Sequence, residues 1–255
     1  MPESRHALIG DIHGNAVALE AVLDDIAQRR VDRIVCLGDI AAGGPQPREV
    51  IGRLRELGCP AVRGNADRWL LEGLPAGRGE TTRRIGDVVA WARDLLAADE
   101  LGYLAALPPT LTIAIGSWTA LCCHGSPRDD VEALLAVTPD DRIEEALSGA
   151  APADAVACGH THLQLLRPHP RGLLLNPGSV GLPLGSLTPA GTGHALPAWA
   201  EYGLVGGDGR DVEIVFRRVP VDRAALARAT DAMPQPTWAG DLARRIERWN
   251  ARSAA

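Results

Sequence analysis

The segment His6-Ala7-Leu8-Ile9-Gly10-Asp11-Ile12-His13-Gly14-Asn15 decides the fold of this chain. It begins with an apolar run of the length of a short buried strand, and apolar residues then recur at helical spacing from Asn15 to about Arg30. Asp11 and His13 therefore lie where the predicted strand ends, the edge at which open α/β sheets bind ligands. Asn15 is a favourable N-cap, so we expect the helix to begin there.

The residues that follow continue this alternation of strand and helix. Segments 33–37 and 60–63 are expected as strands around a helix at 48–57, and the βαβαβ order predicts a parallel sheet with right-handed crossovers. A helical stretch is expected over 83–107, where two prolines end it. Further strands are expected at 111–115, 118–123, 155–158, 163–167, 173–176, 202–205 and 212–219.

This layout predicts an α/β fold, a four-layer α-β-β-α sandwich of two packed mixed sheets with flanking helices. Residues 1–221 are expected to form one domain, and residues 222–255 a C-terminal helical extension packed on it. The long segment from Gly178 to Pro197 has no helical or strand periodicity, so a loop is expected there.

Composition narrows the class of protein. The chain has 255 residues, a hydrophobic fraction of 46% and a formal net charge of −6. No apolar run approaches the roughly 18 residues that a membrane span requires, and the N-terminus lacks the apolar region of a signal peptide, so we expect a cytoplasmic protein without a membrane partner. No block rich in Lys and Arg is present, which argues against nucleic-acid binding as the main activity. A homo-oligomer remains open.

Further motifs place polar side chains beside glycine at the ends of other predicted strands: Gly38-Asp39, Gly64-Asn65-Ala66-Asp67, His124-Gly125 and Gly159-His160-Thr161-His162, with the weaker Asn176-Pro177-Gly178-Ser179 after them. A lone Asp-x-His or His-x-His pair carries little information, but these motifs in this order indicate a metal centre. Four imidazoles with few carboxylates suit Mn, Fe, Co, Ni or Zn better than Mg or Ca.

The motifs together resemble those of the calcineurin-like metallophosphoesterase superfamily, most of all its compact bacterial and archaeal phosphodiesterase branch, over about residues 6–220. The resemblance implies two divalent ions with a bridging hydroxide as the nucleophile. It assigns one ion to Asp11, His13, Asp39 and His162, and the other to Asp39, Asn65, His124 and His160. The bridging carboxylate would be that of Asp39, and Asp39, Asn65 and His124 would be the catalytic ligands.

One position departs from the family pattern. Many members carry a His, implied to protonate the leaving group, where this chain has Ala66. Alanine transfers no proton, and general acid help is typically worth ~10²–10⁴ in rate, so monoesters with poor leaving groups become less favoured substrates. We therefore expect a phosphodiesterase on a small or nucleotide-like substrate. A phosphomonoesterase or protein phosphatase, and a non-catalytic metal-binding scaffold, are the alternatives.

Four residues are candidates for contacts with the substrate phosphate. Asn15 opens a helix whose free amides can face an anion, and Arg63 and Arg68 flank the Asn65 turn. His194, in the long loop, is a candidate substitute for the absent general acid.

Overall fold

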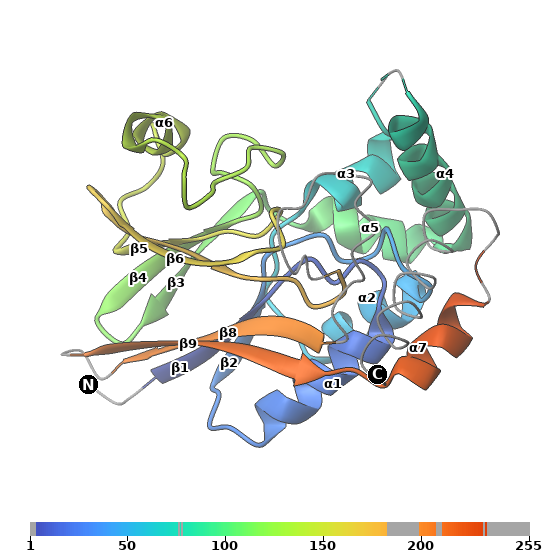
Figure 1. The fold of residues 1–255 in the computed structure, drawn as a ribbon, viewed down its shortest axis with the longest axis horizontal. Coiled ribbons are helices and arrows are strands. Elements are labelled where there is room, and N and C mark those ends of the chain that lie inside the picture. The colour runs from blue at the N-terminus through green and yellow to red at the C-terminus, as the bar shows by residue number, and fades with distance from the viewer. Residues whose placement is uncertain are drawn as a thin grey trace, which may run out of the picture.

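The computed structural model describes residues 4–75, 77, 79–182, 199–207, 211–231 and 233 of the chain. Two mixed sheets pack face to face between helices (Figure 1). The first has the order β2-β1-β8-β9, formed by β1 (Ser4–Ile9), β2 (Arg33–Cys36), β8 (Trp199–Gly207) and β9 (Val212–Pro220). The second has the order β3-β4-β5-β7-β6, formed by β3 (Thr110–Ile115), β4 (Trp118–Cys123), β5 (Ala155–Ala157), β6 (Gln164–His169) and β7 (Gly172–Pro177).

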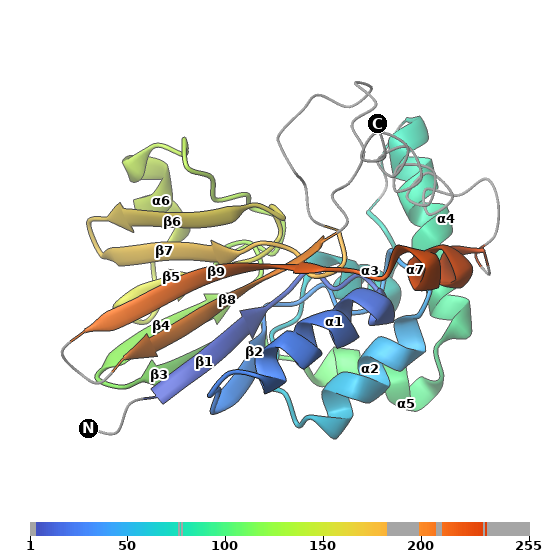
Figure 2. The ribbon, with the colours of Figure 1, turned by 60° about the horizontal axis from the view of Figure 1, so that its bottom comes forward.

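Helices flank the outer faces of this sandwich and also gather at one end of it (Figures 1 and 2). They are α1 (Ala16–Ala27), α2 (Pro47–Glu56), α3 (Asn65–Glu72), α4 (Glu80–Leu95), α5 (Ala98–Ala106), α6 (Asp140–Ala146) and α7 (Arg223–Thr230). Helices α1 and α2 share a core with the outer face of the first sheet, and α6 shares one with the outer face of the second. The four layers and the two mixed sheets confirm the predicted fold class. Within the described ranges, no helix is both long enough and apolar enough to cross a membrane.

Alternation along β1 shows how the sequence builds the layers. Leu8 belongs to the core between the two sheets, where it joins residues such as Cys122 and Leu175. Its neighbours Ala7 and Ile9 belong instead to the core under α1 and α2. Because side chains of a strand point alternately to its two faces, an apolar run with no polar interruption is required for a strand buried on both sides.

Parallel pairing aligns the strand ends that matter for function. β1 pairs in parallel with β2, with Ile9 opposite Cys36. In the other sheet β4 pairs in parallel with β5, with Cys122 opposite Ala157. The loops that leave these four strands therefore emerge at the carboxyl edges of the two sheets, the position that the motifs require.

Several expected elements differ in detail. The strand expected at 60–63 is a single parallel bridge between Ala61 and Cys36, because the chain enters α3 directly after Gly64. Helix α3 begins at Asn65, directly after Gly64. The helical stretch expected at 83–107 is two helices, separated where Leu96 and Ala97 adopt extended backbone conformations. Helix α6 has no counterpart among the expected elements.

Helix α7 lies at the start of the predicted C-terminal extension. The side chain of Asp222 accepts hydrogen bonds from the amides of Ala224 and Ala225 and so caps α7. Leu226 of α7 packs against Leu182. Most of the predicted extension after residue 231 lies outside the described residues.

Candidate metal centre

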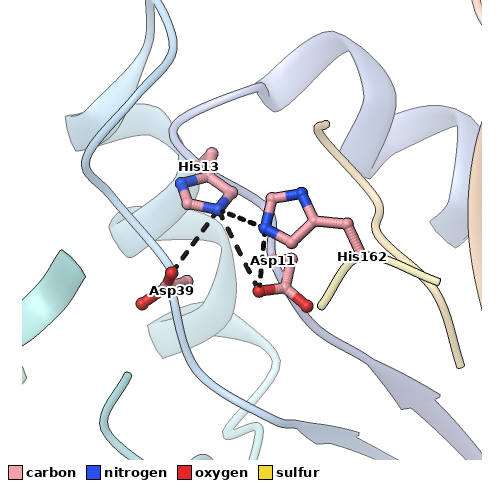
Figure 3. A group of neighbouring side chains, drawn as sticks. All are labelled: Asp11, His13, Asp39 and His162. Carbon is pink, nitrogen blue, oxygen red and sulfur yellow. Dashed lines mark hydrogen bonds and ion pairs between the residues drawn. The ribbon is translucent and has the colours of Figure 1, made fainter. Parts of the chain in front are cut away.

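Residues from five separate motifs converge at the carboxyl edges of the two sheets. Four of them, Asp11, His13, Asp39 and His162, place one ligand atom each within 4.8 Å of one another (Figure 3). His13 Nε2 lies 3.1 Å from His162 Nε2 and 3.5 Å from Asp39 Oδ2. His162 Nε2 lies 3.4 Å from Asp11 Oδ1. This is the set that the family resemblance assigns to the first ion.

The set assigned to the second ion is also brought together. His124 Nε2 lies 3.3 Å from Asp39 Oδ2 and 3.0 Å from Asn65 Oδ1. His160 Nδ1 lies 2.8 Å from the same Asn65 oxygen. Asp39 Oδ2 therefore faces both groups, while Asp39 Oδ1 accepts a hydrogen bond of 2.8 Å from the amide of Ala66 in the first turn of α3. A single carboxylate oxygen, Asp39 Oδ2, thus faces both candidate ion positions.

Backbone carbonyls orient three of the four imidazoles. Nδ1 of His13, His124 and His162 lies 2.7 Å from a carbonyl oxygen in each case. The carbonyls belong to Ala42, Leu37 and Leu182. Since a carbonyl oxygen only accepts, Nδ1 must donate its proton, and in the neutral ring Nε2 then directs a lone pair into the centre. This is the tautomer that a metal-binding histidine needs.

The donor atoms fit cations. With Nδ1 protonated in both rings, the lone pairs of His13 Nε2 and His162 Nε2 face each other at 3.1 Å, an arrangement that repels unless a positive charge lies between them. Asp11 Oδ2 is buried and has no hydrogen-bond partner among the described residues. A buried carboxylate oxygen without a partner is costly, and coordination of a metal removes that cost. Imidazole nitrogens with few carboxylates suit divalent transition metals.

Electrostatics agree with this chemistry. Burial lowers the pKa of His124, but the nearby carboxylates of Asp39 and Asp11 outweigh it and raise that pKa to about 10. Burial opposes ionisation of Asp39, yet the adjacent His124 and His13 rings hold the pKa of its carboxyl below the usual range. Burial and the neighbouring Asp39 raise the pKa of Asp67 to about 7. The ionised carboxylates of Asp11 and Asp39 therefore create a field that attracts positive charge into the centre.

The backbone is held in an uncommon conformation at the same residues. Among the described residues, every non-glycine residue with a positive φ belongs to this centre: Asp11, His13, Asp39, His160 and His162, with φ between 50° and 65°. The left-handed region is unfavourable for residues with a Cβ, and residues held there cluster at functional sites. This conformation turns side chains two residues apart toward the same point.

Residues of the weaker Asn176 motif form hydrogen bonds with the loops that carry the potential ligands. The Asn176 amide donates to the Gly159 carbonyl at 2.6 Å and to Thr161 Oγ1 at 3.1 Å. The Ser179 hydroxyl donates to the Asp11 carbonyl at 2.8 Å and accepts from the Leu182 amide at 2.8 Å. These bonds fix the loops that present the histidines and Asp11.

The candidate phosphate contacts differ in availability. Asn15 caps α1, with Oδ1 accepting from the Ala18 amide and Nδ2 donating to the Gly181 carbonyl, so both of its polar groups are engaged. Arg68 forms two hydrogen bonds of 2.7 Å to Asp130. Arg63 makes no side-chain hydrogen bond or ion pair with any described residue, and it lines a pocket beside His124.

His194 lies outside the described residues. Asp67 accepts hydrogen bonds from the amides of Gly64 and Ile40 and so ties the start of α3 to the Asp39 loop.

A second part of the site, a pocket beside the potential ligands, is not marked by any sequence motif. A pocket of about 240 Å³ adjoins the centre. Its lining includes the potential ligands His13, Asp39, Asn65, His160 and His162. It also includes the apolar side chains of Ala66, Trp69, Ile85, Val88, Val89 and Leu182. The sequence signal for the apolar part of the lining is apolar spacing along two helices, which is equally typical of ordinary core residues.

Comparison with known proteins agrees with the geometry. The chain matches the calcineurin-like phosphoesterase superfamily domain over residues 5–194. It is 30% identical over 208 residues to an uncharacterized protein of Methanocaldococcus jannaschii, covering 74% of this chain and 82% of that protein. It is 37% identical over 101 residues to the symmetrical bis(5'-nucleosyl)-tetraphosphatase of Erwinia tasmaniensis, covering 38% of this chain and 34% of that enzyme.

Solved structures share the architecture. A metallophosphoesterase from Sphaerobacter thermophilus aligns with a TM-score of 0.71 and 27% identity, covering 96% of this chain and 99% of that one. A hypothetical protein from Pyrococcus horikoshii OT3 has the same fold, with a TM-score of 0.76 and 20% identity over 95% of this chain and 97% of that one. On the match of motif order, fold and family domain, the chain belongs to the calcineurin-like phosphoesterase superfamily.

Proposed function

We propose that the protein is a hydrolase of phosphodiesters that uses two divalent transition-metal ions, with Mn, Fe, Zn, Co and Ni as the candidates. The observation that carries the proposal is the arrangement of Asp39. One of its carboxylate oxygens faces His13 Nε2 at 3.5 Å and His124 Nε2 at 3.3 Å, between two groups of potential ligands. A carboxylate shared in this way is what a pair of neighbouring ions requires.

The chain supplies the ligands and holds them in place. Asp11, His13 and His162 would complete the first ion position with Asp39, and Asn65, His124 and His160 the second. Two ions at such a centre lower the pKa of water and stabilise charge on phosphoryl oxygens. The protein's own contribution is orientation, because carbonyls fix the imidazole tautomers and the α3 amide of Ala66 holds Asp39.

Two observations favour diesters over monoesters. Ala66 lines the pocket beside the ligands and cannot protonate a leaving group, so the leaving group itself must be a stable anion. The relative from Erwinia tasmaniensis is named for an activity on nucleosyl polyphosphates, which supports a nucleotide-like substrate here. Arg63, which has no ion-pair partner among the described residues, is the side chain best placed for a further anionic group of such a substrate.

The test compares hydrolysis of bis-p-nitrophenyl phosphate with that of p-nitrophenyl phosphate by chelator-treated protein, with and without added Mn²⁺. We expect metal-dependent turnover that favours the diester. Asp39→Asn is expected to reduce it by more than about 100-fold, since even residues that only support a ligand typically cost 10–100-fold. Asp24→Asn is the matched control, because Asp24 is an exposed residue of α1 and is not one of the potential ligands.

Other outcomes would redirect the assignment. Preference for the monoester would assign the protein to the phosphomonoesterases. Stoichiometric metal binding without turnover on either ester would instead favour a non-catalytic metal-binding scaffold.

A further inference from the structure

The pocket beside the metal centre has two chemically different sides. One side carries potential metal ligands, and the other is formed by apolar side chains of α3 and α4. From this juxtaposition we propose that the pocket binds an apolar ring of the phosphoester substrate, of the size of an aryl group or a nucleobase, while the phosphoryl group lies at the metals. The inference rests on the proposed function and adds the substrate class to it.

Helical spacing produces the apolar side. On α3, Asn65 and Trp69 are four residues apart, so a potential ligand and an indole ring lie on the same face of one helix. On α4, Ile85, Val88 and Val89 have the spacing i, i+3, i+4 and therefore share one face, which lines the same pocket. The ring-binding surface is thus continuous with the metal centre through Asn65.

The lining selects the chemistry of the ligand. Among the residues that line the pocket, Asp39 and the three histidines at the metal end are the titratable groups, and the α4 wall offers aliphatic side chains alone. A charged or strongly hydrated substituent would lose its water there without gaining hydrogen bonds. A flat ring gains from burial and can also stack on the indole of Trp69.

The volume fits a ring. An enclosed apolar cavity of about 150 Å³ is sufficient to bind benzene in another protein. The pocket here is about 240 Å³, which leaves room for a monocyclic ring together with part of a phosphoryl group. Ala66 contributes to this space, because a larger side chain at that position would project into the lining between Asn65 and the apolar wall.

The test uses phosphonates, whose P–C bond resists hydrolysis, so that binding is measured without turnover. Phenylphosphonate and methylphosphonate present the same phosphoryl oxygens and differ in the ring. Isothermal titration calorimetry on the Mn²⁺-loaded protein is expected to show phenylphosphonate binding about 10- to 100-fold more tightly, from burial of the ring. The quantity that tests the inference is this affinity ratio.

Variants locate the effect on α4. Val88→Phe fills the pocket and should reduce the ratio at least about fivefold. Ile85→Gln keeps a similar volume but makes the wall polar, and because Ile85 is only half-buried it tests the wall without overpacking the core. Leu95→Phe is the matched control: it lies on the same helix, its exposed fraction is 40%, and it does not line the pocket, so the ratio should not change.

Each outcome decides between the proposals. Equal affinities of the two phosphonates in the wild-type protein would overturn the ring-binding inference and assign the apolar wall to packing of the chain itself, leaving phosphodiester hydrolysis unaffected. A ratio that survives both Val88→Phe and Ile85→Gln would overturn the assignment to α4. Ring-dependent binding without hydrolysis of any ester would support the pocket and remove the proposed catalysis. No binding of either phosphonate by metal-loaded protein would overturn the ring-binding inference, while the turnover assay alone would decide the proposed catalysis.

Discussion

Left-handed backbone conformations coincide with the predicted metal ligands residue by residue. The five described non-glycine residues with positive φ are all members of the centre. Each such conformation costs on the order of 1 kcal/mol or more for a residue with a Cβ, and the hydrogen bonds around the loops must compensate for it. His124, by contrast, reaches the centre from ordinary backbone geometry directly after β4. A residue can therefore be a potential ligand with or without a strained backbone conformation.

Substitution by Gly and Ala tests this separation. In metal-free protein, we expect His160→Gly to be more stable than His160→Ala by about 1 kcal/mol, because glycine alone adopts φ of 65° without a steric penalty. At His124 the order should reverse, with Ala the more stable, because there glycine only adds entropy to the unfolded chain. Urea unfolding of the four variants measures both differences. The same order at both positions would contradict the role of the backbone.

At the scale of elements, the strand-end loops and α3 approach each other closely enough to exclude a side chain. A Cβ added at Gly64 would overlap Asp39 Oδ1 and the Asp39 amide nitrogen. Gly64 is therefore required by contact and not by its φ of −91°. The start of α3 and the loop after β2 behave as one unit, which Asp67 joins through its hydrogen bonds to both.

Gly64→Ala should separate these two segments and displace Asp39. We expect a loss of stability of about 1–3 kcal/mol, typical of overpacking, and weaker metal binding. Gly52→Ala is the control, because Gly52 lies within α2 and an added Cβ there meets nothing within 4 Å. It should stabilise the protein by about 0.5–1 kcal/mol. Calorimetric titration with Mn²⁺ and urea unfolding test the pair, and unchanged metal affinity in Gly64→Ala would show that the contact is dispensable.

A second junction joins α1 to β8 and β9 of the first sheet. Asp25 of α1 pairs with Arg29, accepts from the Tyr202 hydroxyl at 2.6 Å, and accepts from Arg217 of β9 at 3.1 Å. The hydrogen bond from Arg29 lowers the pKa of Asp25 most, and although burial opposes it, Tyr202 and Arg217 add to the lowering. The Asp25 side chain is 16% exposed, so the pairing is only partly screened by water.

The sign of the pH dependence follows from this lowered pKa. The ionised carboxylate stabilises the folded state above the unfolded pKa of ~3.9, and this contribution is lost as pH falls from there toward the folded pKa. Asp25→Asn should therefore destabilise the protein by about 1–3 kcal/mol at pH 7, with the difference shrinking below about pH 4. Asp24→Asn, at an exposed neighbour, should change stability little. Urea unfolding across this range would contradict the assignment if the Asp25→Asn difference stayed constant with pH.

At the scale of the whole molecule, the sequence predicts what is local or periodic and misses what arises from packing. The strand hairpin 110–123 and the motif at Gly10-Asp11 are readable because apolar alternation and glycine-flanked ligands are local patterns. The break at Leu96 is not, because Leu96 is a good helix former held extended and buried by tertiary contacts. The carbonyls that set the histidine tautomers have no local sequence signal. The same is true of the pocket that residues of α3 and α4 line beside the candidate metal centre.

The candidate metal centre also takes its residues from both sheets of the sandwich. Asp11, His13 and Asp39 follow strands of the first sheet, and His124 and His162 follow strands of the second. Ions that bind the folded state and not the unfolded chain stabilise by mass action, about 2.7 kcal/mol for a ligand at 100 times its Kd. Because the ligands come from both sheets, this stabilisation should reach the whole fold and not one loop.

Metal removal should therefore lower the thermal stability of the entire protein. We expect chelation to reduce Tm by roughly 5–10 °C, since 1 kcal/mol shifts Tm by about 2–4 °C in a domain of this size, and added Mn²⁺ should restore it. Asp39→Asn should lose most of this response because the shared carboxylate is gone, whereas Asp24→Asn should keep it. Differential scanning calorimetry gives the measurement. An identical Tm with and without metal would mean that the ions do not bridge the sheets, because a bridge across the sandwich must be broken before the fold can open.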